Sequence, residues 1–227
     1  MKQVRRVEIE EQITSANDAL AAEVRQRLTE SGVFAINVMA SPGGGKTSLI
    51  MRTVDALKDE LRLAAIDGDV VPVDVDRIAA RGIQVELINT GGNCHLDANQ
   101  MISALPRFDL TSIDLLIVEN VGNLICPASF DLGVDANVVI ASIPEGDDKP
   151  YKYPAMFKGA DVLVLNKIDY LDVQDFDVDY FRQGVEVLNN NLTFLPLSCR
   201  TGEGFEPWLD WLRERVSSKR ADQVAMG

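Results

Sequence analysis

An apolar run at residues 33–39 leads directly into Ala40-Ser41-Pro42-Gly43-Gly44-Gly45-Lys46-Thr47, and this junction constrains the fold more than any other feature of the chain. Glycines allow successive backbone N–H groups to face inward, and the N-terminus of a following helix adds positive dipole, so such a loop cradles phosphate. Lys46 brings a charge to the outer phosphates, and Thr47 offers an oxygen to Mg²⁺. We therefore predict a nucleotide-binding loop whose contacts come from Gly43, Gly44, Gly45, Lys46, Thr47 and Ser48.

Two details of this loop refine the prediction. The usual pattern opens with glycine, whereas this chain has Ala40, so that position needs a backbone conformation that alanine tolerates. A dinucleotide-binding loop is disfavoured, because its G-x-G-x-x-G pattern, started at Gly43, needs glycine or alanine where the chain has Ser48.

Seven short apolar stretches alternate with amphipathic stretches along the chain, which is typical of a parallel sheet with helices on both faces. In such sheets the ligand binds beyond the carboxyl ends of the strands, so motifs that follow strands are expected to converge. We predict an α/β, three-layer P-loop NTPase fold with a mostly parallel sheet of about seven strands. The expected strands are residues 33–39, 63–67, 84–89, 113–119, 137–143, 161–166 and 192–197.

The length and composition indicate one folded domain. The chain has 227 residues, 46% of them hydrophobic, and no long low-complexity linker divides it. Apolar residues recur with helical spacing between residues 8 and 31, so we expect residues 1–30 to form a helix packed on the domain. We expect the nucleotide-binding domain at residues 31–216 and a mobile polar tail at 217–227.

Charge and composition exclude several classes of protein. The formal net charge of −13 argues against nonspecific nucleic-acid binding, which depends on basic surface. The longest apolar runs are too short for a membrane helix, and the first residues lack an apolar signal core, so we expect a cytoplasmic protein without membrane contact. Three cysteines make a disulfide framework unfavourable and leave metal binding open.

A second motif predicts the base. The segment Asn166-Lys167-Ile168-Asp169 follows a strand about 120 residues after the phosphate loop, and Ser198-Cys199-Arg200 follows the last strand. The Asp169 carboxylate can accept from the ring N–H and the exocyclic amine of guanine, whereas adenine presents no ring N–H there. We expect Asn166 to brace the loop, the Lys167 stem to cover the base, and Ser198, Cys199 and Arg200 to lie beside it.

Acidic residues that end strands are candidates for Mg²⁺ binding and hydrolysis. Glu119 ends a buried strand, and we expect it to hold Mg²⁺ directly or through water while the Gly122 N–H senses the terminal phosphate. Asp69 is favoured as a further Mg²⁺ partner or as the group that orients attacking water, with Asp67 next. The sequence leaves open which acid orients the water. We expect slow GTP hydrolysis with Lys46, Asp69 and Glu119 as the catalytic residues.

The single histidine of the chain, His95, directly follows Cys94, and Cys126 lies just beyond the Glu119 segment. A lone histidine is more often structural, but two thiols and an imidazole that follow neighbouring strands would suit Ni²⁺ or Zn²⁺. Three soft ligands leave the shell of a closed site incomplete. A second chain at a two-fold axis would complete it and would link nucleotide state to metal affinity through dimerisation.

These motifs together resemble the HypB family, GTPases that help insert nickel into [NiFe] hydrogenases. The resemblance covers about residues 30–215 and rests on residues 41–48, 89–98, 119–127, 145–154 and 166–169, with the Cys94-His95 element the most specific. It implies a SIMIBI-class GTPase that binds GTP or GDP and forms a homodimer on GTP binding, with Cys94, His95 and Cys126 as nickel or zinc ligands. The implied partners are a HypA-type maturation factor and the hydrogenase large subunit.

The chain departs from the family pattern at two places. Residues 1–30 contain no cysteine or histidine, so neither a tight N-terminal nickel site nor a histidine-rich nickel store is expected. Many relatives have alanine followed by lysine or threonine in the base-side loop, where this chain has Arg200.

Three alternatives remain open. A sibling metallochaperone for urease or a cobalamin enzyme usually carries a different metal loop, such as Cys-Pro-His in the urease type. A metal-storage module would need many histidines, and the complete set of Lys46, Thr47, Glu119 and Asp169 argues against it. An unrelated ATPase or kinase conflicts with Asp169.

Overall fold

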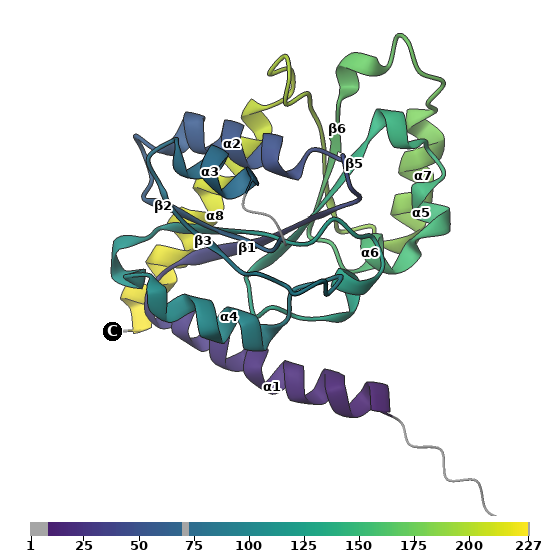
Figure 1. The fold of residues 1–227 in the computed structure, drawn as a ribbon. Coiled ribbons are helices and arrows are strands. Elements are labelled where there is room, and N and C mark those ends of the chain that lie inside the picture. Colours follow the sequence, from purple (N-terminus) through teal and green to yellow (C-terminus); the bar gives the residue numbers. More distant parts are fainter. Residues whose placement is uncertain (1–8, 70–72, 227) are drawn as a thin grey trace, which may run out of the picture.

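The computed structural model describes residues 9–69 and 73–226 (Figure 1). Its centre is a seven-stranded sheet, parallel throughout, in the order β3-β2-β4-β1-β5-β6-β7. The strands are β1 Phe34–Ala40, β2 Leu63–Asp67, β3 Gln84–Leu87, β4 Leu115–Glu119, β5 Ala136–Ser142, β6 Val162–Asn166 and β7 Thr193–Pro196.

Helices cover both faces of this sheet (Figure 1). One face packs against α2 Lys46–Leu57, α3 Val73–Ala79 and α8 Glu206–Met226. The opposite face packs against α1 Ile9–Glu30 and α4 Ala98–Ala104 over β1, β2 and β4, and against α6 Pro154–Lys158 and α7 Val178–Leu188 over β5 and β6. A short helix, α5 Lys149–Lys152, precedes α6.

The alternation of side chains along each strand explains why the sheet is covered on both faces. In β1, Ile36 and Val38 pack in the core beneath α2 and α8, whereas Ala35 and Met39 point into the cores on the opposite face. Every residue of β1 is buried, as expected for the central strand of a parallel sheet between two helical layers.

The predicted fold class is confirmed, and each of the seven predicted strands is present. The boundaries differ by up to two residues: β3 ends at Leu87 rather than at residue 89, and β4 begins at Leu115 rather than at residue 113. β1 runs through Ala40, and an extended backbone suits alanine, which explains why the opening glycine of the loop is dispensable here.

The two terminal helices lie close together at the lower edge of the sheet in Figure 1. The segment 217–227 was expected to be a mobile tail, but α8 continues to Met226, and Gly227 lies outside the described residues. The Lys219 ammonium donates to Thr29 Oγ1 (2.9 Å) and Asp135 Oδ1 (2.5 Å), so polar contacts rather than an apolar stripe hold this end of α8. Within residues 9–69 and 73–226, no helix is long and apolar enough to cross a membrane.

The strand order places the loops that carry the motifs. β1 lies between β4 and β5, so the chain leaves β1 at the point where the order of the sheet reverses. Loops on either side of such a point diverge and leave room for a ligand beyond the carboxyl ends of the strands. The phosphate loop, the segment after Glu119 and the segment after Asn166 all start at this edge.

Candidate nucleotide and metal sites

Contacts from the segment at the end of β6 brace the phosphate loop. Gly45 caps α2 with φ of 108°, and a Cβ there would lie 2.2 Å from Asn166 Nδ2, so only glycine fits. Asn166 Nδ2 donates to the Gly44 carbonyl (3.1 Å), and the Lys167 ammonium donates to the Gly43 carbonyl (2.8 Å). The two nucleotide motifs, more than 100 residues apart in sequence, therefore form one continuous surface.

The outer end of the loop meets the carboxylate that ends β4. Lys46 Nζ lies 3.9 Å from Glu119 Oε1, and both side chains are nearly buried. Thr47 Oγ1 lies 3.0 Å from Glu119 Oε1 and 3.0 Å from Asp74 Oδ2. A hydroxyl has one proton and can satisfy only one of these carboxylates, so the cluster holds more acceptors than donors.

Burial raises the pKa of two acids at this edge. Burial raises the pKa of Asp67 to about 6, with further increases from Asp69 and Asp74. Burial also raises the pKa of Glu119 to about 7, and Lys46 opposes the rise. Asp67 Oδ2 and Glu119 Oε2 are buried without a hydrogen-bond partner among the described residues. Unpaired carboxylate oxygens beside a threonine hydroxyl form the donor set that Mg²⁺ prefers.

The burial of the acids near Thr47 favours a different residue from the one that the sequence favoured. Asp69, which we favoured, is exposed, whereas Asp67 is 2% exposed and carries an unpartnered oxygen. Asp74 contacts Thr47 from the first turn of α3 and was missed, because nothing in the sequence indicates that α3 packs beside α2.

A cavity of about 580 Å³ adjoins the phosphate loop where the base was expected. Most of its polar groups come from the end of β6 and from the two loops that follow β6 and β7. Burial raises the pKa of the Cys199 thiol to about 12, so this cysteine is a neutral wall of the cavity. The cavity is lined by Gly45, Ser48, Pro144, Asn166, Lys167, Asp169, Tyr170, Cys199 and Arg200.

The Asp169 carboxylate is the acidic group of this cavity, and its side chain is 6% exposed. Ser198 Oγ donates to Asp169 Oδ1 (2.5 Å), and Arg200 Nε donates to Asp169 Oδ2 (2.8 Å). The hydrogen bond from Ser198 and the pairing with Arg200 outweigh desolvation and lower the pKa of Asp169. This carboxylate is therefore ionised near neutral pH and suited to accept two N–H groups.

Glu145, at the end of the short turn after β5, braces the phosphate loop from the side. It accepts hydrogen bonds from Ser41 Oγ and from Ser142 Oγ (2.6 Å), and Lys149 Nζ lies 3.8 Å away. Sequence reasoning gave Glu145 no role, although it too is an acid shortly after a strand.

Cys94, His95 and Cys126 form one cluster, with their ligand atoms all within 4.8 Å of one another. Cys94 Sγ lies 3.6 Å from His95 Nδ1. The hydrogen bond between Cys94 and Cys126, together with burial and charge repulsion, raises the pKa of Cys94. Burial lowers the pKa of His95 despite the nearby Asp97, which favours the neutral imidazole that binds metals. The structure thus brings together the three soft ligands that the sequence singled out.

Neighbouring side chains fix the orientation of this cluster. The His95 ring stacks on Phe130, with ring centroids 3.9 Å apart. Asn123 Nδ2 donates to the Cys94 carbonyl (3.2 Å), tying the loop of Cys94 to the loop of Cys126. Gly122 lies in the same segment and packs against Pro42 of the phosphate loop. A Cβ added at Gly122 would lie 3.4 Å from the nearest Pro42 atoms.

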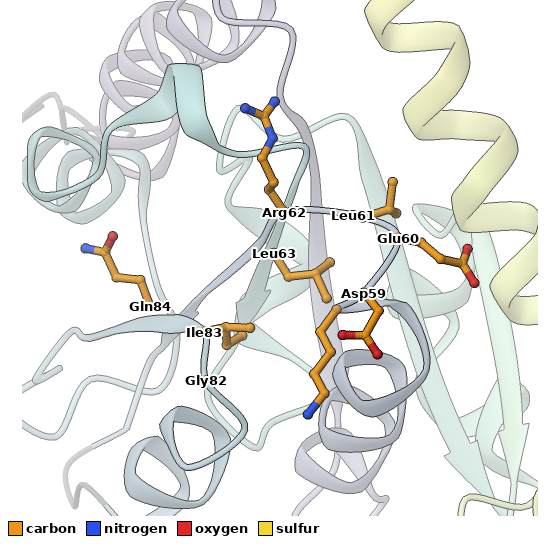
Figure 2. A pocket seen from close by; sticks show the side chains of 9 residues that line it. Asp59, Glu60, Leu61, Arg62, Leu63, Gly82, Ile83 and Gln84 are labelled. Carbon is orange, nitrogen blue, oxygen red and sulfur yellow. The ribbon is translucent and has the colours of Figure 1, made fainter.

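Another hollow, of about 520 Å³, lies at the amino ends of β2 and β3, away from these motifs. Figure 2 shows that the side chains of Asp59, Glu60 and Arg62 point in different directions there. Arg62 is paired with Asp114, and the labelled side chains that line this hollow do not converge on a common point. We therefore assign it no ligand.

Comparisons with known proteins point to the same chemistry. The CobW/HypB/UreG nucleotide-binding domain model matches residues 34–196. The chain is 45% identical to the hydrogenase maturation factor HypB of Rhizobium leguminosarum bv. viciae, over 97% of this chain and 74% of that protein. It resembles the crystal structure of HypB from Archaeoglobus fulgidus at 41% identity, with TM-score 0.84 and coverage of 89% and 99% of the two chains. It resembles HypB from Helicobacter pylori in complex with nickel at 35% identity, with TM-score 0.86 and coverage of 90% and 97%.

Proposed function

The chain belongs to the HypB proteins of the CobW/HypB/UreG family, and from this premise we propose that it is a GTP-hydrolysing metallochaperone that assists nickel insertion into [NiFe] hydrogenase. The observation that supports this most is the soft-ligand cluster of Cys94, His95 and Cys126, built on loops next to a nucleotide site with a guanine-type acceptor at Asp169. A protein that only stored metal would not need Lys46, Thr47 and Glu119 gathered at a phosphate loop.

The proposed hydrolysis uses Mg²⁺ held by Thr47 and Glu119. The exposed Asp69, the buried Asp67 and the half-buried Asp74 supply further acidic oxygens around it. Bound Mg²⁺ neutralises charge that develops on the phosphates. The Lys46 ammonium adds a second positive charge at the outer phosphates, and backbone N–H groups of the loop orient the β-phosphate. The segments after Asp67 and Glu119 carry no glutamine that could orient water, so turnover should be slow.

Nickel is the cargo in this proposal. Two thiolates and one imidazole leave room in the metal's shell, and Cys94 is exposed, so the open side of the cluster can accept a ligand from a second copy of this chain or from a receiving protein. GTP binding would favour the homodimer, and hydrolysis would loosen it. The proposed partners are a HypA-type maturation factor and the hydrogenase large subunit, and Zn²⁺ is the competing metal.

A complementation experiment tests the proposal. The gene is expressed in a host whose own maturation factor of this family is deleted, and hydrogenase activity is measured at low nickel. We expect activity to be restored by the parent protein and not by Lys46→Ala or Cys126→Ala. A purified parent that hydrolyses ATP as readily as GTP, or binds no Ni²⁺, would contradict the proposal.

A further inference from the structure

The base-reading carboxylate is already occupied by the protein itself. Arg200 Nε and Nη2 both lie 2.8 Å from Asp169 Oδ2, while Ser198 Oγ donates to Oδ1. The Arg200 side chain is 71% exposed, whereas that of Asp169 is 6% exposed. An exposed cation therefore covers an almost buried acceptor.

Guanine needs the same acceptor. Its ring N–H and exocyclic amine together donate to both oxygens of one carboxylate, and each oxygen of Asp169 already has a protein donor. The guanidinium also lies 5.8 Å from the centre of the Tyr170 ring, at the mouth of the same cavity. A guanine base cannot pair fully with Asp169 until Arg200 leaves Oδ2.

Ser198 is the less movable of the two donors. It is fully buried, and its oxygen accepts the backbone N–H groups of Arg200 (3.2 Å) and Thr201 (3.1 Å), which fixes the hydroxyl in the turn after β7. Arg200 can rotate into solvent with little loss of packing, because most of its side chain is already exposed. Displacement by a ligand should therefore fall on Arg200.

We propose that Arg200 closes the guanine site of the nucleotide-free protein by pairing with Asp169, so that guanine nucleotides bind in competition with it. This inference rests on the proposed function, since it concerns the same guanine site. It gives the chain a lower affinity for GDP than the rest of the site would provide, which favours nucleotide release after hydrolysis.

Affinity for GDP in two salt concentrations tests the competition. Arg200→Met keeps the apolar stem but removes the donors, and Arg200→Lys keeps the charge without the planar fork. We expect Arg200→Met to bind GDP about two- to fivefold more tightly than the parent at 50 mM NaCl, the range for an exposed ion pair that no longer has to be broken. The difference should shrink at 500 mM NaCl, where the pair is screened, and Arg200→Lys should lie between.

Two controls separate competition from other effects of the substitution. Arg182→Met removes an arginine of similar exposure that pairs with Glu186 on α7, and it should leave GDP affinity unchanged. In an Asp169→Asn background, where no carboxylate holds the guanidinium, Arg200→Met should leave the affinity for xanthosine diphosphate unchanged.

Equal or weaker GDP binding by Arg200→Met at 50 mM NaCl would overturn this inference while leaving the proposed function intact. A parent protein that binds no GDP would overturn the proposed function, and this inference with it.

Discussion

The side-chain oxygen of Asn120 accepts the backbone N–H of Leu96 at 3.1 Å. Asn120 directly follows Glu119, and Leu96 directly follows His95, so one buried amide joins the nucleotide edge to the metal loop. The other end of this amide donates to Asn37 Oδ1 in β1 (3.0 Å), which anchors the junction in the central strand.

Gly68, which follows β2, packs against the Leu96 side chain and gives the nucleotide edge a second contact with the metal loop. The substitution Gly68→Ala should disturb this contact. A Cβ at Gly68 would lie 2.7 Å from the Leu96 side chain, so Leu96 must move, at a cost of about 1–3 kcal/mol. We expect weaker Ni²⁺ binding in equilibrium titrations, because Leu96 adjoins His95. Gly159→Ala, whose nearest atom lies 3.9 Å away, is the matched control. Unchanged nickel affinity in Gly68→Ala would show that the contact does not position the cluster.

Lys46→Ala should abolish GTP hydrolysis. The substitution removes the charge at the outer phosphates and leaves Glu119 without its nearest cation, so we expect a loss of at least about 10²-fold in phosphate release. Lys58→Ala, just beyond the far end of the same helix α2, should hydrolyse GTP at the parent rate. Parent-like hydrolysis by Lys46→Ala would refute the assignment of the phosphate loop.

Asp169→Asn should exchange guanine preference for xanthine preference. An amide offers a donor where the carboxylate offered an acceptor, and xanthine carries a carbonyl in place of the amine. Competition between GTP and XTP for the variant measures the exchange. The base-reading role fails if the variant still prefers GTP.

Single alanine substitutions of Cys94, His95 and Cys126 should each weaken Ni²⁺ or Zn²⁺ binding by at least about tenfold and leave GDP binding nearly intact. Hydrogen bonding to Cys126 raises the pKa of Cys94, so protons compete with the metal and affinity should increase as pH rises. Cys199→Ala should keep parent-like nickel affinity, because Cys199 lines the base cavity. Tight metal binding by Cys126→Ala in every nucleotide state would separate hydrolysis from metal release.

Asp114 should make the fold less stable in acid. Burial alone raises its pKa, but hydrogen bonds from Arg62 and Arg220 outweigh burial and lower the pKa to about 2. A carboxyl whose pKa is depressed on folding stabilises the fold above the unfolded pKa, and this contribution is lost as pH falls from about 4 towards 2. We expect Asp114→Asn to remove about 1–2 kcal/mol of the pH-dependent change in unfolding free energy over that range.

Urea unfolding at several pH values measures this change. Asp210→Asn, an exposed carboxylate on α8, should retain the parent's pH dependence. If Asp114→Asn loses stability between pH 4 and pH 2 as steeply as the parent, the paired carboxylate is not the cause.

Neighbouring residues were enough to predict the parallel sheet, and they also carry the hypotheses of a phosphate loop and a base-reading segment. A phosphate loop needs glycines, a lysine and a hydroxyl in fixed succession, so its whole requirement is written in one stretch, and strand and helix periodicity is equally local. The Cys94-His95 pair was visible for the same reason, although its meeting with Cys126 depended on the order of strands.

Tertiary structure decided which distant groups touch these motifs. Asp67 rather than Asp69 is buried at the sheet edge beside Glu119, and Asp74 reaches Thr47 only because α3 packs beside α2. The pairing of Arg200 with Asp169 likewise depends on the register between β6 and β7. Local sequence fixes backbone conformation, but burial and long-range approach depend on how whole strands and helices pack. The pKa of each acid and the pairing of each charge are therefore properties of the assembled sheet.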